Sequence, residues 1–69
     1  MSFADEFGWT EEEFEVEAEW VQGTIDHAFR LGGFQEVVRE YEDLKANEQY
    51  LNNRQKYLMR VMANIIVMA

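Results

Sequence analysis

The chain has 69 residues, enough for one small domain whose hydrophobic core is close to the smallest that folds without help. It contains no cysteine, which excludes a disulfide framework, and 48% of its residues are hydrophobic, which excludes a wholly disordered chain. The formal net charge of −8 argues against direct binding to nucleic acid, which needs a basic surface.

Residues 1–9 are predicted to form an N-terminal arm in which three aromatic residues, Phe3, Phe7 and Trp9, alternate with acidic ones. Three interpretations are open. The arm folds back over an apolar strip of the domain, it docks into a basic, apolar groove of a partner, or it is a disordered tail. The arm is acidic and lacks the apolar core of a signal peptide, so we expect a cytoplasmic protein.

A first helix is predicted from Thr10 to about Leu31. Thr10 and Glu13 have the spacing of a capping box, and the paired glycines at 32 and 33 are suited to end a helix. Gly23 lies inside this helix and would be explained by the close approach of another helix. The predicted apolar face consists of Phe14, Ala18, Val21, Ile25 and Ala28.

From Phe34 to Ala69 the chain has no glycine or proline, and apolar residues recur at alternating steps of three and four. This spacing predicts one long amphipathic helix. Two polar residues, Glu48 and Gln55, interrupt the seam. The alternative is a helix end near Asn52–Asn53, with Gln55 completing a second capping box. The aliphatic half of the seam is Val37, Leu44, Leu51, Leu58 and Ile65.

Two long helices joined by a short glycine turn predict an all-α fold, an antiparallel helical hairpin that forms a single domain over residues 10–69. The charge distribution favours this pairing. Residues 1–31 carry nine acidic side chains and one basic side chain, whereas residues 32–69 carry five of each. The acidic first helix is therefore expected to lie along the more basic second one.

The segment 61–69 contains a single polar residue, Asn64, and a helix that is apolar on all sides must be buried on all sides. Nine residues are too few to cross a bilayer, which needs about 20. We therefore predict a homo-oligomer that forms a helical bundle, although the methionines could instead meet a foreign partner. The predicted interface consists of Leu51, Leu58, Met62, Ile65, Ile66 and Met68.

Two acidic couples, Glu12 with Glu15 and Glu40 with Asp43, have the only spacing that suggests catalysis. It resembles the ExxE and ExxD signature of the MazG-like all-α nucleoside triphosphate pyrophosphatases. That resemblance implies four carboxylates on neighbouring helices that hold magnesium against a phosphate chain. The alternative is that acids three residues apart form a solvated helix face.

No other motif indicates an enzyme, a metal site or a cofactor. His27 is the only histidine, Ser2 is the only serine, and the paired glycines end a helix instead of forming a phosphate loop. We predict no catalytic residue, no metal ligand and no cofactor.

The predicted function is that of a small, acidic, non-enzymatic interaction protein, an adaptor or inhibitor, that self-associates and binds a larger protein. In one alternative, the acidic helix face imitates nucleic-acid phosphates and blocks a DNA- or RNA-binding protein. In another, the acidic face only keeps the oligomer soluble. The predicted partner-binding residues are Phe3, Phe7, Trp9, Glu12, Glu15 and Glu19.

Overall fold

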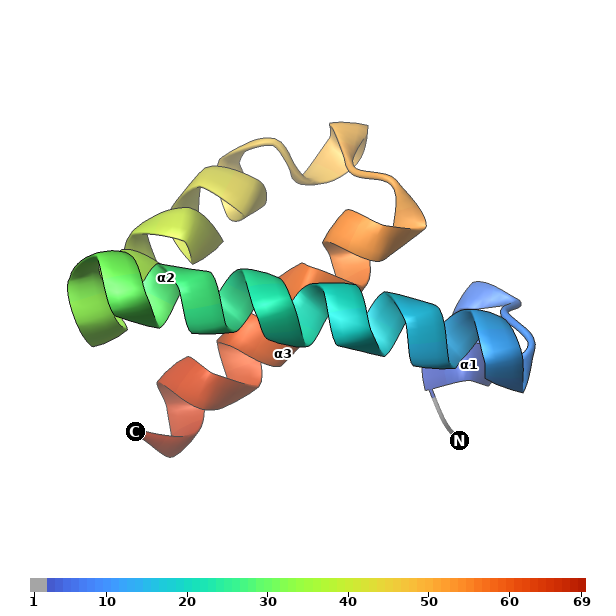
Figure 1. Cartoon of the computed structure of the whole chain (residues 1–69). Helices are drawn as coiled ribbons and strands as arrows, with labels where there is room; N and C mark the ends of the chain where they lie inside the picture. The colour runs from blue at the N-terminus through green and yellow to red at the C-terminus, as the bar shows by residue number, and fades with distance from the viewer. Residues whose placement is uncertain (1–2) are drawn as a thin grey trace.

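The computed structural model describes residues 3–69, and over this range the chain is helical, with no strand (Figure 1). Helix α1 spans Phe3–Phe7, α2 spans Glu11–Ala46, a single 3₁₀ turn η1 spans Glu48–Tyr50, and α3 spans Asn53–Met68. The predicted all-α class is therefore correct for the described chain.

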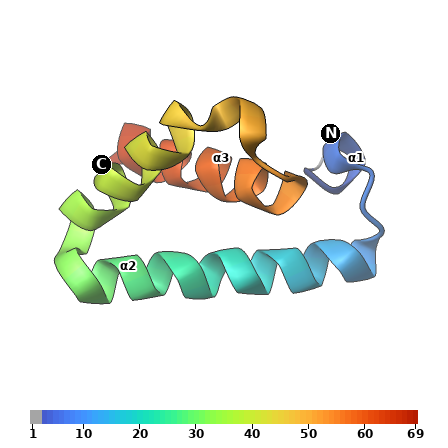
Figure 2. The ribbon, with the colours of Figure 1, turned by 90° about the horizontal axis from the view of Figure 1, so that it is seen from above.

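Helix α2 consists of two segments, residues 11–32 and 34–46, that meet at a sharp bend. Gly33 makes the bend because its φ of 69° and ψ of −153° lie in a region that residues with a side chain rarely adopt. Figure 2 shows the second segment turning back from the end of the first. At the other end, the Thr10 hydroxyl accepts a bond from the Glu13 N–H at 3.1 Å, and the Glu13 carboxylate accepts one from the Thr10 N–H at 2.9 Å. Both predicted ends of the first helix are confirmed.

The predicted single helix from Phe34 onward is wrong, because the chain leaves the helical conformation after Ala46. Leu51 and Asn52 are extended, and α3 starts at a second capping box. The Asn52 side chain accepts a bond from the Gln55 N–H at 2.9 Å, and the Gln55 side chain accepts one from the Asn52 N–H at 3.1 Å. The alternative end near Asn52 is confirmed, since an asparagine side chain satisfies N–H groups that the first turn of a helix leaves free.

The break changes the hairpin into a three-part arrangement. The second segment of α2 turns back from the bend and rises away from the first at a wide angle, and α3 then reverses again and crosses the first segment obliquely, in the same general direction (Figures 1 and 2). The predicted antiparallel pairing is therefore wrong for α3, which packs across α2 in the same general direction as its first segment.

The hydrophobic core draws on all three parts. Val37 and Met62 are fully buried, the first from the second segment of α2 and the second from α3. Other core residues approach them from the first segment of α2 and from α3, so removal of any part would expose the other two. The buried cluster is Val21, Ile25, Ala28, Val37, Tyr57, Leu58 and Met62.

Gly23 does not mark a close helix contact. It is exposed, and a Cβ atom at this position would meet nothing within 4 Å apart from its chain neighbours and the nearby backbone of its own helix. The prediction was wrong because the core forms on the side of α2 that carries Val21 and Ile25, leaving Gly23 in solvent.

The N-terminal arm covers part of the core. Ala4 is buried, and Phe7 and Trp9 pack against the core beside Tyr57. The ring centroids of Trp9 and Tyr57 are 5.8 Å apart in an edge-to-face arrangement, and those of Phe7 and Trp9 are 4.9 Å apart. Of the three interpretations of the arm, folding back is the one seen for Phe7 and Trp9. The side chain of Phe3 lies outside the described residues.

Candidate functional site

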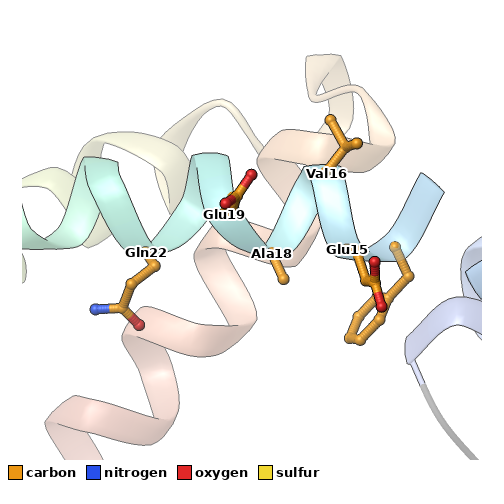
Figure 3. Close-up of a pocket in the computed structure, with 6 residues that line it drawn as sticks. Glu15, Val16, Ala18, Glu19 and Gln22 are labelled. Atoms are coloured by element: carbon orange, nitrogen blue, oxygen red, sulfur yellow. The ribbon is translucent and has the colours of Figure 1, made fainter. Parts of the chain in front are cut away.

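A shallow hollow lies along the first segment of α2, and we call it the acid-edged strip. Its lining combines three apolar residues, half-buried Phe14 and Ala18 and exposed Val16, with three exposed polar residues, which are Glu15, Glu19 and Gln22. Figure 3 shows Glu15, Ala18 and Gln22 extending toward one side of the helix, whereas Val16 points the opposite way. The helical repeat explains this grouping, because residues three, four and seven apart share a face.

The carboxylates of this face have no cationic partner among residues 3–69. Glu12, Glu15 and Glu19 are exposed and take part in none of the ion pairs found in that range. Their charges therefore reach solvent and produce a negative potential beside the apolar lining. Such a surface favours a ligand that is both basic and apolar.

The neighbouring carboxylate of Glu17 forms an ion pair within the chain. The Arg54 guanidinium forms a two-pronged contact with it, in which Nη2 donates to Oε1 at 3.0 Å, and lies 4.9 Å from the centre of the Trp20 ring. The hydrogen bond from Arg54 lowers the pKa of Glu17. A lowered pKa in the folded state means that this ion pair stabilises the fold above the ordinary glutamate pKa, and that its stabilisation disappears as the pH falls through the lowered value.

A second ion pair, between Glu6 and Arg60, ties α1 to α3, and the Arg60 guanidinium lies 5.9 Å from the centre of the Phe7 ring. Together with Glu17–Arg54 it joins the acidic first part of the chain to the more basic last part. The charge complementarity expected from the sequence is therefore present, with α3 as the basic element.

A second candidate surface is apolar and lies at one end of the molecule, where the α2 bend and the end of α3 are both found (Figures 1 and 2). Leu31 and Phe34 flank the bend and are 65% and 39% exposed, and Val67 and Met68 of α3 are 83% and 85% exposed. We call these four residues the apolar end. Of these four residues only Met68 is among those predicted to form a binding surface, although the position of Leu31 and Phe34 beside the glycine pair is a signal for exposure.

The residues predicted for an oligomer interface fall into three groups. Leu58 and Met62 are buried in the chain's own core, Met68 is exposed, and the others are half-buried. The apolar segment 61–69 is thus covered in part by the chain itself. The half-buried members are Leu51, Ile65 and Ile66.

The residues predicted for partner binding are also divided. Phe7 and Trp9 pack against the core, whereas Glu12, Glu15 and Glu19 are exposed on α2. The structure adds Phe14, Ala18 and Gln22 to these carboxylates. Sequence reasoning assigned Phe14 and Ala18 wholly to the core, because a helical repeat does not show how far the core extends around a helix.

The two acidic couples do not come together. Burial raises the pKa of Glu40, and His27 is close enough to act on it electrostatically. His27 follows Glu15 by twelve residues of helix, a rise of about 18 Å. Within residues 3–69 no three carboxylate, histidine or cysteine side chains are grouped as metal ligands. The arrangement implied by the MazG-like resemblance is therefore not formed.

The fold and these surfaces define an all-α protein with two candidate binding surfaces. Comparisons with protein-family models, curated proteins and solved structures find no match to the chain. In the part of the chain that the structure describes, no helix combines the length and apolar character needed to cross a membrane.

Proposed function

We propose that the chain is a small, non-enzymatic interaction protein that binds a larger protein through the acid-edged strip. The observation that carries this proposal is that the apolar residues Phe14 and Ala18 line the same hollow as the acidic residues Glu15 and Glu19. The matching segment of the partner is an amphipathic helix whose apolar side chains meet the lining and whose lysines or arginines meet the carboxylates.

The dimensions of the strip suit a short helix. From Phe14 to Gln22 the helical rise is about 12 Å, roughly two turns, which matches anchors at positions i, i+4 and i+7 of a partner helix. A nucleic-acid mimic would use the same carboxylates but would leave the apolar lining unused. The lining therefore favours an amphipathic protein segment as the ligand. A nucleic-acid-binding protein is one class of partner that could carry such a segment.

Charge reversal in the strip tests this proposal. The double variant Glu15→Lys/Glu19→Lys replaces attraction with repulsion and is expected to weaken partner capture by at least about tenfold. The matched control is Glu42→Lys/Asp43→Lys, with the same charge change at exposed positions on the second segment of α2. Wild type and both variants serve as bait in lysate of the source cell, and captured proteins are identified by mass spectrometry.

The expected result is a protein captured by the wild type and the control but not by the strip variant, with capture that weakens as salt is added. Equal capture of the same protein by all three baits would contradict the assignment of the strip as the binding surface.

We also propose that the chain self-associates. The support is the exposure of four apolar side chains, which belong to the bend of α2 and to the end of α3: Leu31, Phe34, Val67 and Met68. Apolar side chains that a small protein leaves exposed are candidates for an association surface. The molar mass in solution, measured by sedimentation over a range of concentrations, tests this part of the proposal.

A further inference from the structure

We infer that two copies of this chain associate by exchanging α3. In the exchanged dimer the link at residues 47–52 straightens, the second segment of α2 continues directly into α3, and α3 of each copy packs on α2 of the other. This inference rests on the self-association proposed above and specifies how it occurs.

The first support is the register of the apolar seam across the link. The five aliphatic positions are spaced by seven residues, which is about two turns of helix, so one continuous helix would keep all of them on one face. In the folded chain each of the five is buried or half-buried, although the helix is broken between the second and the fourth and the third lies in the link itself. The seam residues can therefore be buried in both the broken and the continuous form of the helix. The positions are Val37, Leu44, Leu51, Leu58 and Ile65.

The second support is the backbone of the link. Residues 48–50 already form a 3₁₀ turn, and the extended residues are Leu51, with φ −77° and ψ 142°, and Asn52, with φ −80° and ψ 176°. Both φ angles are close to helical values, so the conversion needs a change of ψ at these two residues, together with a smaller adjustment at Asn47, whose φ is −110° and ψ is 22°. The link contains no glycine or proline, and apart from half-buried Leu51 its residues are exposed.

The third support is that exchange conserves the core. Tyr57, Leu58 and Met62 of α3 pack with core residues of α2, and the same packing can form between two chains. Exchange disrupts only the link, where the main interaction that must break is the capping box of Asn52 and Gln55. Helical hydrogen bonds through the link replace it and favour the continuous form.

Two substitutions distinguish the closed form, in which α3 packs on α2 of its own chain, from the exchanged dimer. Asn53 is the first residue of α3 and follows an extended residue, a position that proline accepts, whereas inside a continuous helix proline would break it. Asn53→Pro is therefore expected to leave the closed chain helical and to lower the dimer association constant by at least about 1,000-fold, because two links must straighten per dimer. Asn52→Ala removes a cap that only the closed form uses, and should raise the constant by about 30-fold.

Cross-linking identifies the exchange directly, because the chain has no cysteine of its own. Glu17 of α2 and Arg54 of α3 form an ion pair, so cysteines at these two positions would be close enough to cross-link. One chain therefore carries Glu17→Cys and the other Arg54→Cys, and the mixture is treated with a short bismaleimide. The two thiols are adjacent only when α3 of one chain lies on α2 of the other. The expected product is a covalent dimer on a denaturing gel, absent when Asn53→Pro is added to both chains.

Two results would overturn the inference in distinguishable ways. A dimer that forms no cross-link, is unchanged by Asn53→Pro and is abolished by Leu31→Glu/Met68→Glu would show association through the apolar end without exchange. A wild type and an Asn52→Ala variant that both stay monomeric at all concentrations would overturn exchange and self-association together, while leaving partner binding by the acid-edged strip to its own test.

Discussion

Met62 and Met68 occur in the same helix and have the same side chain, yet their surroundings are opposite. Met62 is 0% exposed and contacts core residues from α2, whereas Met68 is 85% exposed at the apolar end. A buried apolar side chain stabilises the fold both by leaving water and by filling space that neighbouring atoms cannot fill. Position in the fold, and not residue type, therefore decides what each methionine contributes.

Met62→Ala is expected to lower the free energy of unfolding by about 2–5 kcal/mol, because it leaves a cavity in the core. Met68→Ala is the matched control and should change the free energy of unfolding by no more than about 0.5 kcal/mol. Urea denaturation followed by circular dichroism, at a concentration where the protein is monomeric, measures both. Similar decreases for the two variants would show that Met62 is not in a well-packed core.

At the scale of the element, the path of α2 depends on two glycines with different roles. Gly23 has helical geometry and is exposed, so its lack of a side chain serves no packing purpose in the folded chain. Gly33 has a positive φ, and its conformation sends the second segment of α2 back toward the core, where Val37 is buried. Only the second glycine is required by the fold.

Opposite effects are expected when each of these glycines is replaced by alanine. Gly23→Ala should raise the free energy of unfolding by about 1 kcal/mol, since alanine is the better helix former and nothing obstructs its methyl group. Gly33→Ala should lower it by about 1–3 kcal/mol through backbone strain alone, because no atom lies within 4 Å of the added carbon. Thermal unfolding of the two variants beside the wild type gives both values, and a Gly33→Ala protein as stable as the wild type would contradict the bend.

The whole molecule has its charge distributed unevenly over a small body, whose extents are 33 × 24 × 19 Å. Ion pairs with Arg54 and Arg60 hold two of the N-terminal carboxylates, and the exposed carboxylates of the acid-edged strip remain open to a partner. The bend of α2 and the end of α3, which carry the exposed residues of the apolar end, lie at the same end of the molecule (Figure 2). Two kinds of association with different physical origins are therefore expected from one chain.

Salt should change these two associations in opposite directions. Each copy carries a net charge of −8, so screening weakens the repulsion between copies and should strengthen self-association as NaCl rises from about 50 mM to about 300 mM. Binding of a basic partner depends on attraction and should weaken over the same range. Sedimentation velocity measures the first effect, and titration calorimetry with the captured partner measures the second. A self-association that weakens with salt would indicate an interface formed by opposite charges.

The sequence by itself determined the helical class, the capping boxes at Thr10 and Asn52, and the glycine bend after the first helix. These features depend on interactions between residues within about four positions of one another, so they can be predicted from the spacing of those residues. The sequence also indicated the carboxylates of the candidate binding surface, because their positions follow the helical repeat.

Only the tertiary structure decided whether the chain from Phe34 onward stays in one helix and where α3 packs. The seam residues permit both a continuous and a broken helix, and the choice depends on how much apolar surface α3 buries by returning to α2. That burial joins residues far apart in the chain, such as Ile25 and Met62, and no local pattern specifies it. For the same reason Leu58 and Met62 became core residues, while Val67 and Met68, in the same apolar run, were left in solvent.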